Sequence, residues 1–235
     1  MRIPLKLATV MIAAAMAFLQ GCNDDSNNGD DAISLPDKQF QLDVTNLTHN
    51  QAISAVGVIL HDSAYQLFTL GEAATVALEE LAEGGDNSAL LSEANSNGAV
   101  IDTVAGTAMI VPGSSERFML GGNASALEVS LAGMLVNTND GFAALNGAAI
   151  GHLERGASVT FHAKVFDAGS EGNSEAAAEL PGQGGEGFNA ARNDRDFVTV
   201  HPGVLSMVDG LATSALDQSH RFDNPALKVV VTRLQ

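Results

Sequence analysis

The chain of 235 residues has one cysteine, no tryptophan and one tyrosine. A single cysteine, Cys22, excludes an intramolecular disulfide. Without tryptophan, and with tyrosine only at Tyr65, the chain has few aromatic rings for a sugar-stacking surface, which disfavours carbohydrate binding. The chemistry of any binding site must therefore come mainly from charged and polar side chains.

Positive charge is scarce as well. Eleven Lys and Arg residues stand against 28 Asp and Glu residues, which gives a formal net charge of -17. Proteins bind nucleic-acid phosphates chiefly through Lys and Arg, so we expect no nucleic-acid partner. Such an acidic surface suits a soluble domain in a salty medium or one rich in divalent cations.

The N-terminus has the layout of a secretory signal peptide, which we place at residues 1–21. Arg2 and Lys6 precede an apolar run over residues 7–19, which is too short to cross a bilayer stably. The sequence Leu-Gln-Gly-Cys then ends at Cys22 and is similar to a bacterial lipobox, whose cysteine carries the lipid. Lipidation would also explain an unpaired cysteine in an exported protein. The alternative is a plain signal peptide that ends near a cysteine.

Residues 22–37 form a polar, acidic tract with almost no apolar residue able to join a core. Its composition predicts a flexible tether, which the repulsion between aspartates would keep extended. We therefore expect a domain that is exported and lipid-anchored in the bacterial cell envelope. The sequence leaves open whether the anchor lies in the inner or the outer membrane.

Alternation of apolar and polar residues dominates the rest of the chain and predicts strands. Helical spacing occurs over residues 73–83, before a Gly-Gly stop, and a second short helix is predicted at 88–94. Many short strands between Gly, Asn and Pro turns predict a mainly β domain over residues 38–235, an antiparallel two-sheet β-sandwich with one or two short helices. The alternating apolar positions are Phe40, Leu42 and Val44; Phe118 and Leu120; Leu127, Val129 and Leu131; Val159, Phe161 and Ala163; Phe197 and Val198; Leu227, Val229 and Val231.

Two acidic turns follow apolar runs. Asp140 comes after the run that ends at Val136, and Asp167 and Glu171 come after the run that ends at Phe166. If both turns lie at one end of a sheet, the three carboxylates come together and form the outline of a calcium site. Calcium prefers oxygen ligands and tolerates irregular loops. Gly169 would supply a positive φ where the second turn needs one. The alternative is a pair of ordinary solvated turns, which use the same residue types.

In their order along the chain, these two turns resemble the spondin amino-terminal domain, with runs that read approximately Pro-Ser-Pro-Asp-Trp-Phe-Val-Gly and Asp-Ala-Gly-Thr-Asp/Glu. The resemblance extends from about Phe40 to the C-terminus. It includes the Thr-Asn-Leu-Thr run at 45–48, the stretch at 67–74 with the helix that follows it, and Val-His-Pro-Gly at 200–203. It implies an extracellular β-sandwich with a calcium site.

Carried over position by position, the resemblance implies Asp140, Asp167 and Glu171 as calcium ligands. The chain departs from the family pattern around these acids: Asn-Thr-Asn replaces the proline-rich lead-in, Gly141 stands where the family often has Trp, and Ala-Ala replaces Val-Gly at 143–144. The packing around the site is thus less well defined by the sequence than its ligands.

Enzyme motifs give little support for catalysis. The sequence contains no Gly-x-Ser-x-Gly elbow, no His-x-x-x-His pair and no phosphate-binding loop. His61 and His201 both follow apolar runs, and together they would form an alternative metal or catalytic site, although buried structural histidines are the more common outcome. We expect a calcium-binding adhesion or protein-interaction module, with an extracellular or envelope protein or polymer as partner. The alternative is an exported hydrolase or metalloenzyme built on His61 and His201.

Overall fold

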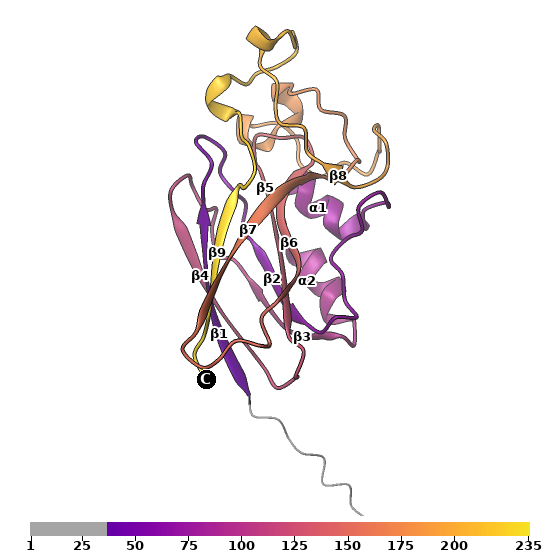
Figure 1. Cartoon of the computed structure of the whole chain (residues 1–235). Coiled ribbons are helices and arrows are strands. Elements are labelled where there is room, and N and C mark those ends of the chain that lie inside the picture. Colours follow the sequence, from indigo (N-terminus) through magenta and orange to yellow (C-terminus); the bar gives the residue numbers. More distant parts are fainter. Residues whose placement is uncertain (1–36) are drawn as a thin grey trace, which may run out of the picture. The chain divides into compact units, whose positions relative to one another are not determined.

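The structure is a computed structural model that describes residues 37–235 (Figure 1). The predicted signal peptide at 1–21, Cys22 and the linker up to residue 36 lie outside the described residues. Residues 37–235 all belong to one compact unit. Within this range, no helix has both the length and the apolar character needed to span a membrane.

Strands make up most of the regular structure, with two α-helices between the second and third strands. The mainly β prediction is therefore confirmed. The strands are β1 (Lys38–Asn46), β2 (Gly57–His61), β3 (Val100–Ala105), β4 (Ser115–Gly122), β5 (Glu128–Met134), β6 (Gly141–Ala149), β7 (Ser158–Asp167), β8 (Thr199–Val200) and β9 (Leu227–Arg233). The helices are α1 (Val76–Gly84) and α2 (Ser88–Asn95), with short 3₁₀ turns η1 (Ala177–Glu179), η2 (Pro181–Gln183), η3 (Met207–Asp209) and η4 (Gln218–His220).

The strands form one antiparallel sheet that is nearly closed into a barrel. Its order is β3-β2-β5-β6-β7-β9-β1-β4, and β8 pairs with β7. The two end strands, β3 and β4, lie close together, and the Gly121 amide donates to Asp102 Oδ2 at 2.9 Å between them. β7 pairs with β6 over its C-terminal half and with β9 over its N-terminal half, so it joins the two halves of the sheet.

Two apolar layers hold the sheet and helices together. Inward-facing side chains of the sheet, among them Phe40, Leu42 and Phe118, fill the inside of the barrel. A second layer, which includes Leu78 and Phe142, lies between the helices and the outer face of the sheet. In Figure 1, α1 and α2 stand on one side of the barrel, beside β6 and β2. Burial on both faces explains why the central strands lack clear alternation.

Helix α1 begins after a capping threonine and ends at glycine. The Thr75 hydroxyl accepts a hydrogen bond from the Leu78 amide at 3.2 Å, which caps the N-terminus. At the other end, Gly85 adopts φ +73, and its amide donates to the Leu81 carbonyl. Helices were expected at 73–83 and 88–94, and the observed bounds differ by at most three residues.

Three strands were not predicted from alternation. β2 is buried at every position, so it has no polar face. β3 is a partly exposed end strand of the sheet, with no fully buried residue. β6 is rich in alanine and glycine, residues with low strand propensity, and part of it was interpreted as a turn. Conversely, a strand was expected at 197–198, whereas β8 begins at Thr199.

The long C-terminal loops gather at the end of the barrel that is farthest from Lys38. β7 pairs Ser158 with Thr232 at one end and Asp167 with Gly141 at the other. Lys38 and the C-terminus lie near the Ser158 end, whereas the loops over 168–222 cover the Asp167 end (Figure 1). The glycine-rich stretch at 181–187 is fixed at its start by the Gly182 amide, which donates to the Val136 carbonyl at 2.6 Å.

Candidate metal centre

The carboxylate of Asp140 lies at the end of the sheet because of a tight turn between β5 and β6. The Thr138 hydroxyl donates to the Leu135 carbonyl at 2.7 Å and accepts from the Gly141 amide at 3.0 Å. Gly141 is also required sterically, because a Cβ there would come within 2.6 Å of Thr138 Oγ1. The turn places Asp140 one residue before β6, fully buried.

Asp167 ends the neighbouring strand and pairs directly with Gly141. The Ala168 amide donates to the Asp140 carbonyl at 3.2 Å, which continues the ladder by one step. The structure therefore brings the two aspartates together on adjacent strands. Their side chains repel one another, since the charge of Asp167 contributes to the raised pKa of Asp140.

The loop that follows β7 folds back over Asp140. Asp140 Oδ2 accepts hydrogen bonds from the amides of Ser170 at 2.9 Å and Glu171 at 3.1 Å. Gly169 allows this reversal with φ +76, as the sequence predicts, and a Cβ there would lie 2.3 Å from the Phe197 carbonyl oxygen. The loop thus brings Glu171 to the two aspartates.

A fourth acid, Glu83 of helix α1, was not predicted. The pKa of Glu171 is raised to about 8 by burial first, and then by the charges of Glu83 and Asp140. Ser170 lies between the two elements: its Oγ donates to Asp140 Oδ2 at 3.3 Å, and the same side chain lowers the pKa of Glu83, although burial raises that pKa more. We call Glu83, Asp140, Asp167 and Glu171 the acidic cluster. No sequence pattern relates Glu83 to the others, and its place in the last turn of a helix is the only unusual feature.

Hydrogen-bond donors satisfy the cluster only in part. Asp167 is well supplied, since Oδ1 accepts from the Gly169 amide at 3.0 Å and Oδ2 accepts from Asn173 Nδ2 at 2.8 Å. In contrast, Asp140 Oδ1 and Glu83 Oε1 are buried and have no hydrogen-bond partner within residues 37–235. Unpartnered buried carboxylate oxygens are costly, so these two atoms mark where a ligand would be stabilising.

Nearby positive charge does not neutralise the cluster. Arg192 pairs with Glu79 at 2.7 Å and with Asp196 at 2.8 Å. Arg195 lowers the pKa of Asp167, but burial dominates and raises it overall. Burial, followed by the Asp167 charge, raises the pKa of Asp140 to about 7.

The donor set of the cluster suits a hard cation. All four side chains are carboxylates, and calcium takes about six to eight oxygen ligands in irregular geometry. Within residues 37–235, however, no three His, Cys, Asp or Glu side chains are already arranged to hold a metal ion. A cation would therefore draw the carboxylates inward from positions in which they repel one another.

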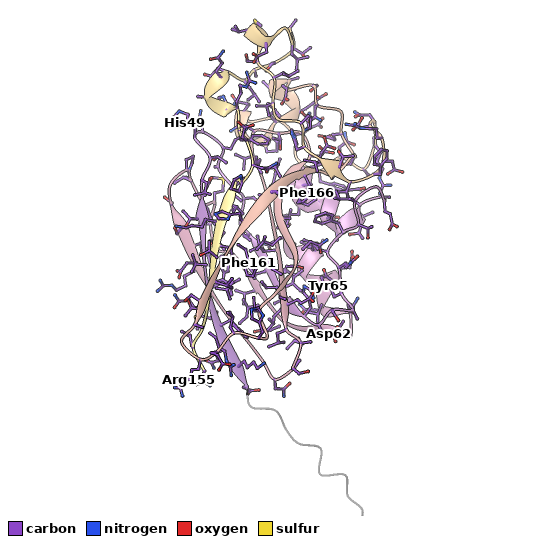
Figure 2. All side chains as sticks on the ribbon, viewed as in Figure 1. His49, Asp62, Tyr65, Arg155, Phe161 and Phe166 are labelled. Carbon is purple, nitrogen blue, oxygen red and sulfur yellow. The ribbon has the colours of Figure 1, made fainter. Side chains whose placement is uncertain are left out.

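His61 and His201 are not brought together. His61 pairs with Glu128 of β5, which in turn pairs with Ala149 at the far end of β6. His201 lies against Gly141 at the near end, so the two histidines are separated by most of β6, about 26 Å. In Figure 2, Asp62 and Tyr65, neighbours of His61, lie well below Phe166 at the loop end of β7.

His61 is held through both ring nitrogens, whereas His201 is held through one. His61 is fully buried, with Nδ1 at 2.7 Å from the Asp62 carbonyl oxygen and Nε2 at 2.8 Å from Ser130 Oγ. Burial lowers the pKa of His201 to about 4, so its ring is neutral at pH 7. Its Nδ1 accepts from the Gly203 amide at 3.0 Å, and its Nε2 is buried without a hydrogen-bond partner in residues 37–235. His162, on β7, is exposed.

A hollow of about 700 Å³ lies close to the cluster but contains none of its carboxylates. Its walls come from the loops around Ser54 and Met109, the end of β5, and Gly84 and Gly85 at the end of α1. The lining is mostly small or apolar, which does not suit an inorganic cation. The chemistry of the site therefore lies in the acidic cluster.

Comparison of the chain with protein-family models and with curated proteins finds no match in either.

Proposed function

We propose that this protein is a calcium-binding adhesion or protein-interaction module of the spondin type, with Asp140, Asp167 and Glu171 as calcium ligands. The observation that carries the proposal is the buried, unpartnered Oδ1 of Asp140 beside two other carboxylates. If Asp140 had only a structural role, the cost of burying this oxygen without a partner would not be offset. A bound cation offsets both that cost and the repulsion between the carboxylates.

The proposal includes a spondin-like β-sandwich. Support comes from β7, which divides its pairing between β6 and β9 and so separates the sheet into two facing halves. The apolar layer inside the barrel would then be the layer between the two sheets of a sandwich.

We further propose that the protein is exported and anchored by a lipid on Cys22 to the bacterial envelope. The position of the acidic cluster supports this arrangement, because it lies at the opposite end of the barrel from Lys38 (Figure 1). A tether attached at Lys38 would direct the cluster away from the membrane. There, a calcium ion with incomplete protein ligation accepts a carboxylate or phosphate oxygen from a partner protein or polymer.

Calorimetric titration tests the metal site directly. Calcium chloride is titrated into the full-length protein, purified in detergent and freed of divalent cations with a chelator. We expect saturable heat from the wild type and none from the double variant Asp140→Asn, Asp167→Asn. Absence of saturable heat from the wild type at millimolar calcium would refute the calcium site.

Adhesion tests the functional part. Cells that display the wild-type protein should adhere to a partner surface in calcium and detach in chelator, and cells with the double variant should not adhere in either. Equal adhesion by both proteins in chelator would show that any interaction is independent of the acidic cluster.

A further inference from the structure

Glu83 is in an unfavourable position for a structural carboxylate. It is the penultimate residue of α1 and only 1% exposed. The C-terminal end of a helix carries partial negative charge, which favours bases there and disfavours acids. The last turn of α1 has no basic residue to offset this effect.

The hydrogen bonds of Glu83 do not explain the charge either. Oε2 accepts from the Asn189 amide at 2.7 Å, which a glutamine oxygen would do equally well. Oε1 has no partner in the described part of the chain. Arg192, whose charge acts on Glu83, already pairs with Glu79 and Asp196. A neutral side chain of the same shape would therefore fit this site at lower cost.

The charge of Glu83 acts on the other members of the acidic cluster. Its charge acts on both Asp140 and Glu171, and Ser170 lies between them and Glu83. The two buried oxygens without partners, Glu83 Oε1 and Asp140 Oδ1, come from a helix and from the start of a strand. The two residues are 57 positions apart in the sequence.

We infer that Glu83 is a direct ligand of the same cation as Asp140 and Glu171, so that calcium ties helix α1 to the end of the sheet. The inference rests on the proposed function. It adds a ligand that the turns around Asp140 and Asp167 do not reveal, and it makes the packing of α1 dependent on the ion. Asp167, whose two oxygens already accept hydrogen bonds, then contributes less to ion affinity than Glu83 does.

Calcium titration of single variants in the full-length protein tests this assignment. Glu83→Gln keeps the shape and removes the charge, Glu83→Asp keeps the charge and withdraws it by one methylene, and Glu80→Gln is the matched control. Glu80 is half-buried on the same helix and forms no hydrogen bond or ion pair through its side chain with residues 37–235.

We expect Glu83→Gln and Glu83→Asp to weaken calcium binding at least about tenfold, and Glu80→Gln to change it less than about twofold. Hydrogen exchange gives a second readout: calcium should slow exchange of the α1 amides in the wild type and not in Glu83→Gln. Thermal unfolding in chelator should show Glu83→Gln to be at least as stable as the wild type.

Each contrary result has a distinct meaning. If Glu83→Gln binds calcium like the wild type while Asp140→Asn does not, Glu83 is no ligand and the proposed function stands. If Glu83→Asp binds normally while Glu83→Gln is weakened, Glu83 acts only through long-range charge, and direct ligation is refuted. If the wild type binds no calcium, the proposed function and the inference both fail.

Discussion

The substitution Asp140→Asn should stabilise the protein without calcium and abolish the further stabilisation that calcium gives to the wild type. Asparagine Oδ1 can accept the two amide hydrogen bonds that now reach Asp140 Oδ2, so the loop over the cluster is retained. The substitution removes a buried negative charge that lies next to Asp167 and Glu83. In the absence of an ion, only the repulsion and the desolvation cost are lost.

The raised pKa of Asp140 sets the magnitude. The difference between its pKa of about 7 and the ordinary value of 3.8 corresponds to roughly 4 kcal/mol, at about 1.4 kcal/mol per pH unit. Relaxation and water penetration reduce such costs, so we expect a gain in the free energy of unfolding of about 1 to 3 kcal/mol at pH 8. In a protein of this size, that gain raises Tm by roughly 2 to 4 °C per kcal/mol.

The sign of the pH dependence follows from proton linkage. Between about pH 4 and pH 7 the folded state holds a proton on Asp140 that the unfolded state has released. The stability of the wild type without calcium therefore falls as pH rises through this window and is level above it. The advantage of Asp140→Asn should accordingly be large at pH 8 and less than half as large at pH 5.

Urea unfolding, followed by far-ultraviolet circular dichroism at pH 5 and pH 8, measures these differences in chelator and in calcium. We expect calcium to raise the unfolding midpoint of the wild type and to leave that of Asp140→Asn unchanged. A variant that is less stable than the wild type in chelator at both pH values would refute the argument, because Asp140 would then be a stabilising structural residue.

Three further substitutions test the surroundings of the site. Glu175→Gln removes a buried carboxylate whose pKa burial raises to about 7, and it should raise the urea midpoint at pH 8 but not at pH 4, with calcium affinity unchanged. Gly169→Ala should lower stability by at least about 2 kcal/mol and abolish calcium binding in calorimetry, because its Cβ would collide with the Phe197 backbone. Thr75→Ala should cost about 1 kcal/mol in urea unfolding through loss of the cap on Leu78, with little effect on calcium affinity.

The sequence predicts strands that have one face in the core better than strands that are covered on both faces. In β1 and β9, alternation of buried and partly exposed residues follows from having one face in the core, and the pattern can be read directly. β2 is covered by the core on one face and by the helices on the other, so it has no polar face. A run of this kind does not distinguish a strand from a buried helix.

The site shows a similar division between local and distant residues. Asp167 and Glu171 lie four residues apart in one turn, and Asp140 lies in a similar turn one strand earlier, so local pattern is enough to nominate them. Glu83 comes from a helix that only the tertiary structure places over these turns. The separation of His61 from His201 depends in the same way on strand register, which neither flanking sequence encodes.

The acidic cluster connects the stability of the domain to its surroundings. Buried carboxylates that repel one another lower the stability of the folded state at neutral pH, and the unfolded chain does not suffer this cost. A cation that binds only the folded state at about one hundred times its dissociation constant adds about 2.7 kcal/mol. This gain is similar to the cost assigned to Asp140 alone, so calcium would largely offset it. The proposed module would then be weakly folded around α1 where calcium is scarce and fully ordered where calcium is abundant, which restricts its binding surface to the compartment that supplies the ion.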